Sequence, residues 1–192
     1  MRKVILQEFV SLDGYAAGPN GDVNFIPESS KGDKRWGAEQ TALMGRVDTL
    51  LLGRVTYDFF SQFWPAVTQG EEKEFADKFN GVPKIVFSKT LQRAPWGNWG
   101  EARIVGDAVA EVAKLKKQSG KDMLISGSIS IGQALSEANL VDEYHVIVCP
   151  VVLGGGRALF RDKASGKQLE LIDSHSLARG AVSLLYRERA AS

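Results

Sequence analysis

A regular alternation of short apolar runs and amphipathic segments is the feature that most constrains how this chain can fold. The apolar runs have the length of buried strands, and the amphipathic segments have the residue spacing of helices. We predict strands over residues 3–11, 49–53, 83–91, 102–105, 122–128 and 142–152. We predict helices over residues 38–47, from Val55 onward, and over 71–79, 107–119 and 128–140. Strands that alternate with helices pair in parallel through right-handed crossovers, so this pattern indicates an α/β fold.

The last part of the chain breaks this alternation. Residues 168–176 and 180–188 are two strand-like segments with a short turn between them, which favours an antiparallel hairpin. A chain of 192 residues can bury one sizeable core. We therefore predict one domain spanning residues 1–192, with a mixed and mostly parallel sheet.

Residues 13–36 follow neither the strand pattern nor the helix pattern. The segment is rich in glycine, proline and asparagine, and Asn20-Gly21 is a strong turn signal. We predict a long loop here. A loop of this length in a compact domain is typical of an active-site lid or of a disordered segment.

Aromatic residues gather in one of the predicted helices. Phe59, Phe60, Phe63 and Trp64 follow one another at roughly one-turn spacing. This spacing predicts an amphipathic helix that packs its aromatic side chains into the core. The alternative is an exposed protein-interaction surface made from residues 57–64 with Trp96 and Trp99.

Composition excludes several classes of protein. The 24 basic and 23 acidic residues leave a formal charge of +1, so no strong field would attract nucleic acid or an anionic membrane. Cys149 is the only cysteine, and His145 and His175 are the only histidines, so we expect no metal site. No run approaches the ~20 apolar residues of a membrane-spanning helix. We expect a cytoplasmic protein that binds a small molecule.

The junction at Ser126-Gly127-Ser128 is a candidate phosphate site. It joins a predicted strand directly to a predicted helix, so backbone N–H groups and the helix dipole would point toward an anion. Gly127 would let a pyrophosphate approach the backbone closely. The alternative is an ordinary tight connection between a strand and a helix.

Two other strand ends carry cationic and hydroxyl side chains. Arg54 and Thr56 follow the strand at 49–53, and a guanidinium beside a hydroxyl at a helix start suits a phosphate. The alternative is that Arg54 pairs with Asp58 four residues later. Ser88 and Lys89 could add donors for a second phosphate, or could form an ordinary solvated strand end. Ligands of open α/β sheets bind at the carboxyl ends of the strands, where all these residues are predicted to lie.

Five segments together resemble the dihydrofolate reductase superfamily, particularly the C-terminal reductase domain of the bifunctional riboflavin-biosynthesis enzyme. These segments are SLDGYAAGPNGD at 11–22, TLLLGRVTYDFF at 49–60, KIVFSKTL at 84–91, MLISGSISIGQAL at 123–135 and DEYHVIVCPVVLGGGRALF at 142–160. The resemblance implies a three-layer α/β/α fold with a mixed eight-stranded sheet, NADPH as cofactor, and a homodimer. The zinc deaminase signature of the bifunctional enzyme does not occur in this sequence.

The resemblance also implies roles for individual residues. The cofactor-contacting residues that it implies are Gly53, Arg54, Thr56, Ser88, Lys89, Ser126, Gly127 and Ser128. Substrate would lie between the segment from Asp13-Gly14 to Phe25 and an opposite wall made of Pro150, Leu153 and Gly154. Dihydrofolate reductase holds its pterin with a carboxylate on its first helix. The candidates for that carboxylate here are Glu39 and Asp13, with Asp48 less favoured.

Two functions from different classes follow. The first is an NADPH-dependent reductase that transfers a hydride to a small nitrogen heterocycle, such as a 5-amino-6-(5-phosphoribosylamino)uracil-like pyrimidine or a pterin. The second is a nucleotide-binding or ligand-sensing protein that has kept the fold without catalysis. Turnover of NADPH with a candidate acceptor would distinguish the two.

Overall fold

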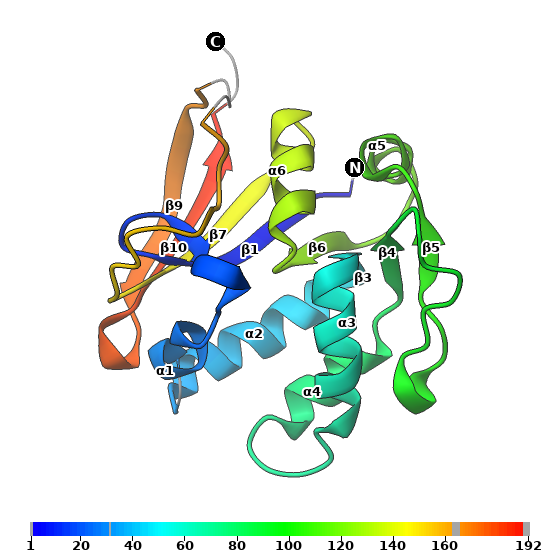
Figure 1. The fold of residues 1–192 in the computed structure, drawn as a ribbon, viewed down its shortest axis with the longest axis horizontal. Helices are drawn as coiled ribbons and strands as arrows, with labels where there is room; N and C mark the ends of the chain where they lie inside the picture. The colour runs from blue at the N-terminus through cyan, green and yellow to red at the C-terminus, as the bar shows by residue number, and fades with distance from the viewer. Residues whose placement is uncertain (1, 31, 163–165, 190–192) are drawn as a thin grey trace.

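In a computed structural model, which describes residues 2–30, 32–162 and 166–189, the chain forms one eight-stranded sheet with helices on both faces (Figure 1). The strands of this sheet are β1 (Val4–Ser11), β3 (Val47–Gly53), β4 (Lys84–Phe87), β5 (Arg103–Val105), β6 (Asp122–Ser126), β7 (Glu143–Cys149), β9 (Leu169–Ser176) and β10 (Val182–Glu188). The helices are α1 (Phe25–Ser30), α2 (Lys34–Arg46), α3 (Arg54–Phe63), α4 (Lys73–Gly81), α5 (Ala108–Lys116) and α6 (Ile129–Glu137).

The strand order confirms the predicted mixed sheet. It runs β5-β4-β3-β6-β1-β7-β10-β9, and the first six strands are parallel to their neighbours. The last two are antiparallel, because β10 pairs with β7 and β9 pairs with β10. The predicted C-terminal hairpin is therefore present, and its strands lie within one or two residues of the predicted ranges.

The core lies in two layers, one on each face of the sheet. Successive strand residues point to opposite faces. Leu6 on β1 therefore joins a cluster with the side chains of α5 and α6, while Ile5 joins a second cluster with those of α2, α3 and α4. Figure 1 shows α5 and α6 above the sheet and α2 to α4 below it. The result is the predicted three-layer arrangement. No helix within the described residues is long and apolar enough to cross a membrane.

The predicted loop over residues 13–36 is partly wrong. It contains a short strand, β2 (Tyr15–Ala17), which pairs antiparallel with β8 (Arg157–Ala158), and it also contains α1. Helix α2 begins at Lys34, because the Asp33 side chain accepts a hydrogen bond from Trp36 N at 2.9 Å and caps the helix. Elements this short carry too few residues to show a periodicity, so the turn residues around them dominate the sequence pattern.

The predicted strand at 83–91 is also too long, because β4 ends at Phe87. The chain turns at Ser88, whose hydroxyl accepts hydrogen bonds from Thr90 N at 3.2 Å and from Leu91 N at 3.1 Å. A serine side chain that binds backbone N–H groups a few residues ahead competes with strand pairing. The predicted strand therefore extends four residues beyond the observed one, which ends at Phe87.

The aromatic residues of α3 divide between the core and the surface. Phe60 and Trp64 pack against the buried Phe79, as predicted. Phe59 and Phe63 do not enter the core: they are 57% and 42% exposed, and their rings stack on each other with centroids 5.9 Å apart. A helix against a sheet buries only one stripe, so four aromatics at mixed spacings cannot all face inward.

Candidate functional site

The three strand ends with glycine, hydroxyl and cationic residues meet at the carboxyl edge of the sheet. Strand β3 lies between β4 and β6, and Gly53 at the end of β3 is paired with Phe87, which precedes Ser88. Gly53 N donates a hydrogen bond to the Ser128 hydroxyl at 2.9 Å. The turns after β3, β4 and β6 therefore form one continuous surface, as the strand order requires for neighbouring parallel strands.

The turn between β6 and α6 is close to α3. A Cβ atom on Gly127 would lie 3.4 Å from the Thr56 methyl group, so the two turns touch. Gly127 and Ser128 both have a positive φ, 62° and 68°, and this turns the chain sharply into α6. The hydroxyl of Ser128 is used to join this turn to Gly53, while the first N–H groups of α6 face the carboxyl edge of the sheet. Such N–H groups, together with the helix dipole, suit an anionic ligand.

The cationic side chains at this edge already have local contacts. Arg54 Nη1 lies 2.8 Å from Asp58 Oδ2, which is the pairing that the sequence left open as an alternative. Both side chains are about half exposed, at 51% and 43%. An exposed pair of this kind contributes about 0.5 kcal/mol, so a phosphate could replace Asp58 at little cost. The Ser88 hydroxyl accepts a hydrogen bond within its own turn, and the neighbouring Lys89 is exposed.

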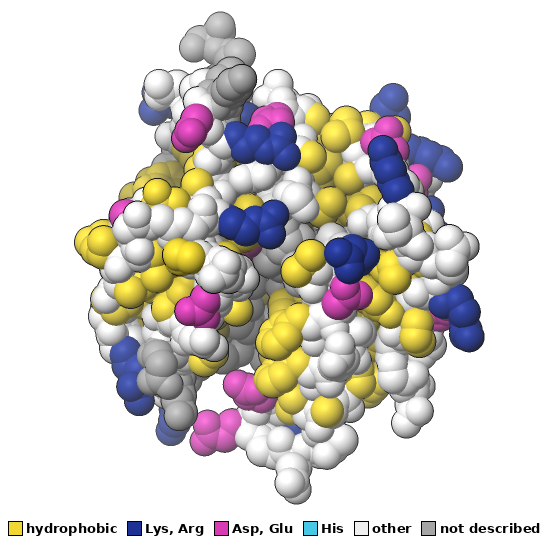
Figure 2. Space-filling view, viewed as in Figure 1, with side chains coloured by type: hydrophobic (Ala, Val, Ile, Leu, Met, Phe, Trp, Pro, Cys, Tyr) yellow, Lys and Arg dark blue, Asp and Glu magenta, His cyan; other side chains and the backbone are white. Residues whose placement is uncertain are grey.

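A hollow of about 440 Å³ lies beside the start of α3. It is lined by Gly18, Pro19, Asn20, Gly21, Val55, Gly156 and Arg157. A Cβ atom on Gly156 would lie 2.1 Å from the Ala17 carbonyl oxygen, so only glycine allows the two loops to approach. Figure 2 shows this face of the molecule hollowed near its centre, with Lys and Arg side chains around the hollow and apolar side chains along one wall.

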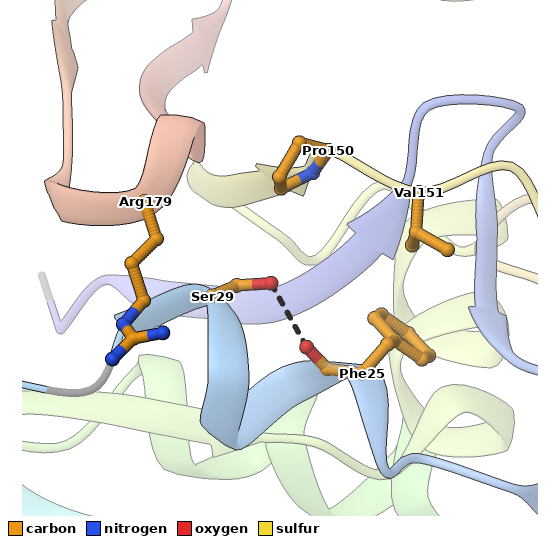
Figure 3. Close-up of a pocket in the computed structure, with 5 residues that line it drawn as sticks. All are labelled: Phe25, Ser29, Pro150, Val151 and Arg179. Carbon is orange, nitrogen blue, oxygen red and sulfur yellow. Dashed lines mark hydrogen bonds between the residues drawn. The ribbon is translucent and has the colours of Figure 1, made fainter.

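A second hollow, of about 330 Å³, lies between α1 and the loop after β7. It is lined by Phe25, Ser29, Pro150, Val151 and Arg179 (Figure 3). Residues 18–21 and 156–157 contribute to the first hollow, and nearby stretches of the same two segments, 25–29 and 150–151, contribute to the second. Of the predicted substrate contacts, Phe25 and Pro150 line this second hollow.

Asp13 holds one of these loops in place. Its carboxylate accepts hydrogen bonds from Leu153 N at 3.1 Å and Gly154 N at 2.7 Å. The Ser11 hydroxyl, followed by these backbone groups, lowers the pKa of Asp13 to about 2. An ionised carboxylate bound to two N–H groups is suited to positioning the loop and unsuited to donating a proton. Gly14, with φ of 86°, makes the turn that follows it.

The other candidate carboxylates lie away from both hollows. Glu39 on α2 forms an ion pair with Arg35 at 2.8 Å, and its other oxygen lies 3.1 Å from His175 Nε2. Asp48 lies at the start of β3, at the opposite edge of the sheet, where it pairs with Arg2. Neither residue is among those that line the two hollows.

Three charged residues were missed by the sequence analysis. Arg157 and Arg179 line the hollows, and only the tertiary structure brings them there. Glu8 is 5% exposed on the face of β1 that α5 and α6 cover, and its Oε2 has no hydrogen-bond partner among the described residues. Burial raises the pKa of Glu8 to about 8. A glutamate inside an otherwise apolar run was the available signal.

Comparison with known proteins identifies the family of this chain. The profile of the RibD C-terminal domain family matches residues 2–183. The chain belongs to this family. The protein YyaP of Bacillus subtilis (strain 168) is 32% identical over 188 residues, covering 96% of this chain and 94% of YyaP.

Solved structures share the fold of this RibD C-terminal domain family member. A protein of Shewanella sp. PV-4 named for riboflavin biosynthesis superposes with a TM-score of 0.75 at 27% identity, covering 97% of this chain and 99% of that one. Dihydrofolate reductase from Enterococcus faecalis, solved with NADP(H), gives a TM-score of 0.63 at 12% identity, covering 97% of this chain and 96% of that one. The chain therefore has a dihydrofolate reductase-like fold.

Proposed function

We propose that this protein is an NADPH-dependent reductase that transfers a hydride to a small nitrogen heterocycle. The observation that carries the proposal is the convergence of the turns around residues 54, 88 and 127 on one edge of the sheet. Family membership and the fold of reductases support the same conclusion.

The residues at this edge fit a dinucleotide. Gly127 has no side chain and a positive φ, so a pyrophosphate can approach the backbone at the first turn of α6. Arg54 and Lys89 supply the positive charge for a further phosphate on the adenosine ribose. In this arrangement Ser128 acts through its bond to Gly53 N, holding two of the turns together.

The chain would act chiefly by positioning the two reactants. NADPH supplies the hydride, and one proton from solvent or an acidic group completes the reduction of the acceptor. The heterocycle would lie in the hollow beside Phe25 and Pro150, and the cofactor would extend toward it along the hollow beside α3. Asp13 would hold the loop at 153–154 in the position that closes this arrangement against water.

Turnover tests the proposal directly. NADPH absorbance is followed with 5-amino-6-(5-phosphoribosylamino)uracil and, separately, with dihydrofolate as acceptor. We expect oxidation of NADPH that depends on at least one acceptor. Saturable NADPH binding without oxidation would instead support the second candidate, a non-catalytic binding protein. The observation that favours this candidate is that no carboxylate is among the described residues lining either hollow.

Arg54 allows the cofactor preference to be tested. We expect Arg54→Ala to weaken NADPH binding about tenfold and NADH binding less than about twofold, because only NADPH carries the extra phosphate. Arg93→Ala is the matched control, since Arg93 is an exposed arginine paired with Glu101 on a loop outside both hollows. Equal losses for the two cofactors would reject this role for Arg54.

A further inference from the structure

The hollow between α1 and the loop after β7 combines an apolar wall with one charged side chain. Phe25, Pro150 and Val151 form the apolar part, and Arg179 is the charged residue among the described residues that line it. Figure 3 shows the Arg179 side chain reaching down from the β9–β10 turn toward α1, where its guanidinium lies near Ser29. The hollow therefore offers an apolar surface for a ring and a cation beside it.

The size of the hollow limits what it can take. A volume of about 330 Å³ is at the small end of ligand sites, which span roughly 300 to 1,000 Å³. A single heterocyclic ring with a short substituent fits this volume. A flat ring would pack against the Phe25 side chain, since aromatic groups favour stacked or edge contacts.

Arg179 is held on a turn that is fixed at several points. The turn Ala178–Gly180 joins β9 to β10, and the bond from Leu177 N to the Ala181 carbonyl, at 2.8 Å, closes it. Ala178 N donates a hydrogen bond to the Asp33 carboxylate, which also caps α2. This backbone bond is the main cause of the lowered pKa of Asp33. The turn is thereby tied to the helix that follows α1.

The backbone of Arg179 is itself unusual. Its φ is 66°, a left-handed conformation that costs a non-glycine residue about 1 kcal/mol or more. The neighbouring Gly180 lies against Pro150, since a Cβ atom there would be 3.8 Å from the proline ring. A large cationic side chain is thus kept at a position that favours glycine or asparagine, at the rim of a hollow.

We propose that Arg179 binds an anionic substituent, a phosphate or a carboxylate, on the heterocycle that this hollow takes. A guanidinium can donate two parallel hydrogen bonds to either group, so it fixes the orientation of the ligand as well as contributing affinity. The inference rests on the proposed function for the identity of the ring. It assigns the selection of the substrate to the C-terminal hairpin, whereas the turns after β3, β4 and β6 serve the cofactor.

Binding measured without NADPH tests the inference separately from turnover. Isothermal titration calorimetry compares 5-amino-6-(5-phosphoribosylamino)uracil with its dephosphorylated form, which isolates the phosphate. Orotate is compared with uracil, which isolates a carboxylate. We expect the wild-type protein to bind the anionic member of at least one pair about tenfold more tightly. The pair that shows this preference identifies the anion.

Variants of Arg179 test whether the preference for the anionic compound comes from the β9–β10 turn. Arg179→Gln is expected to reduce the preference to less than about twofold while leaving the neutral compound bound as before. Arg179→Asn suits the left-handed backbone, so a loss of preference in this variant does not come from backbone strain. Arg187→Gln is the control, because Arg187 lies on the same hairpin, pairs with Glu170 and lines neither hollow.

Three results would overturn the inference: equal affinity for the members of both pairs, a preference that persists in Arg179→Gln, or no binding of any of the four compounds. Turnover of NADPH together with equal affinities would reject the role of Arg179 and keep the reductase. A phosphate or carboxylate preference without turnover would reject the reductase and keep the role of Arg179.

Discussion

The two ends of the parallel strands differ sharply in how their polar groups are used. At the amino ends, charged side chains are bound to one another and to the backbone. These contacts include Arg2 with Asp48, Arg46 with Asp122 and Glu143, Lys3 with Glu143, and Lys116 with Asp142. Lys84 at the start of β4 donates hydrogen bonds to three carbonyl groups at the end of α4. Few of the charged groups at the amino ends are therefore available to bind a ligand.

The carboxyl ends have a different chemistry. Glycine, serine and threonine make the turns there, two hollows open beside them, and the cationic side chains are exposed or half exposed. Because all six parallel strands run in one direction, every strand end that could bind a ligand lies at the same edge. The comparison teaches that this fold separates the residues that stabilise it from the residues that we propose to bind its ligands.

The largest expected effect is a loss of stability from a substitution at the amino ends of the strands. Arg2 is almost fully buried, so Asp48→Ala leaves a charge without its main partner. We expect the free energy of unfolding in urea to fall by about 3 kcal/mol. Asp77→Ala, which removes an exposed pair on α4, is the control and should cost less than about 0.5 kcal/mol. The folded fraction of Asp48→Ala should bind NADPH normally, and a parallel loss of affinity would contradict the separation of the two ends.

Glu8 gives an effect of intermediate size that depends on pH. Its pKa is raised by burial to about 8, so the folded state holds a proton that the unfolded chain releases above about pH 4.5. This group therefore stabilises the protein at low pH, and the contribution is lost as the pH rises toward 8. We expect Glu8→Gln to gain about 2 kcal/mol of unfolding free energy relative to wild type between pH 6 and pH 8.

The measured quantity in this experiment is the difference between variant and wild type. Burial lowers the pKa of His145 and of Lys84, so these two groups act on stability in the opposite direction in both proteins. Glu74→Gln, at an exposed position on α4, is the control for replacing a carboxylate by an amide at the surface. An unchanged difference for Glu8→Gln would mean that Glu8 is ionised in the folded protein.

The smallest expected effect on stability comes from a substitution at the carboxyl ends of the strands, where it also tests cofactor binding. Gly127→Ala places a methyl group next to Thr56 on a backbone with positive φ, so we expect a stability loss of about 1 kcal/mol. NADPH affinity should fall about tenfold, because the methyl group crowds the turn that is proposed to bind the pyrophosphate. Gly45→Ala on α2, where a Cβ atom meets nothing within 4 Å, is the control and should leave affinity unchanged. Normal affinity in Gly127→Ala would remove the cofactor from this turn.

Much of the fold could be predicted because its patterns are local. The buried strand at 49–53 and the hairpin of 168–176 and 180–188 lie close to where the structure has them. The failures are also local in origin. Strand β4 stops early because the Ser88 hydroxyl accepts hydrogen bonds from two N–H groups, and the sequence pattern does not reveal that competition.

The sequence predicted where the candidate site lies better than it predicted the hydrogen bonds and ion pairs that its residues make. The turns around residues 54 and 127 do meet, but the Ser128 hydroxyl is taken by Gly53 N and Arg54 is paired with Asp58. Asp13 was a candidate catalytic carboxylate, and the sequence did not reveal that it accepts hydrogen bonds from Leu153 N and Gly154 N. Whether a polar group remains available to a ligand depends on neighbours that the sequence does not name.

By itself, the sequence determined the order of strands and helices and the residue types at the strand ends, because both follow from periodicity and turn chemistry over a few residues. Only the tertiary structure decided which polar groups are satisfied, which carboxyl group is buried, and which loops enclose a hollow. Phe25 and Arg179, which line one hollow, come from opposite ends of the chain. Burial and hydrogen-bond partners are set by such long-range contacts, so no local pattern carries them.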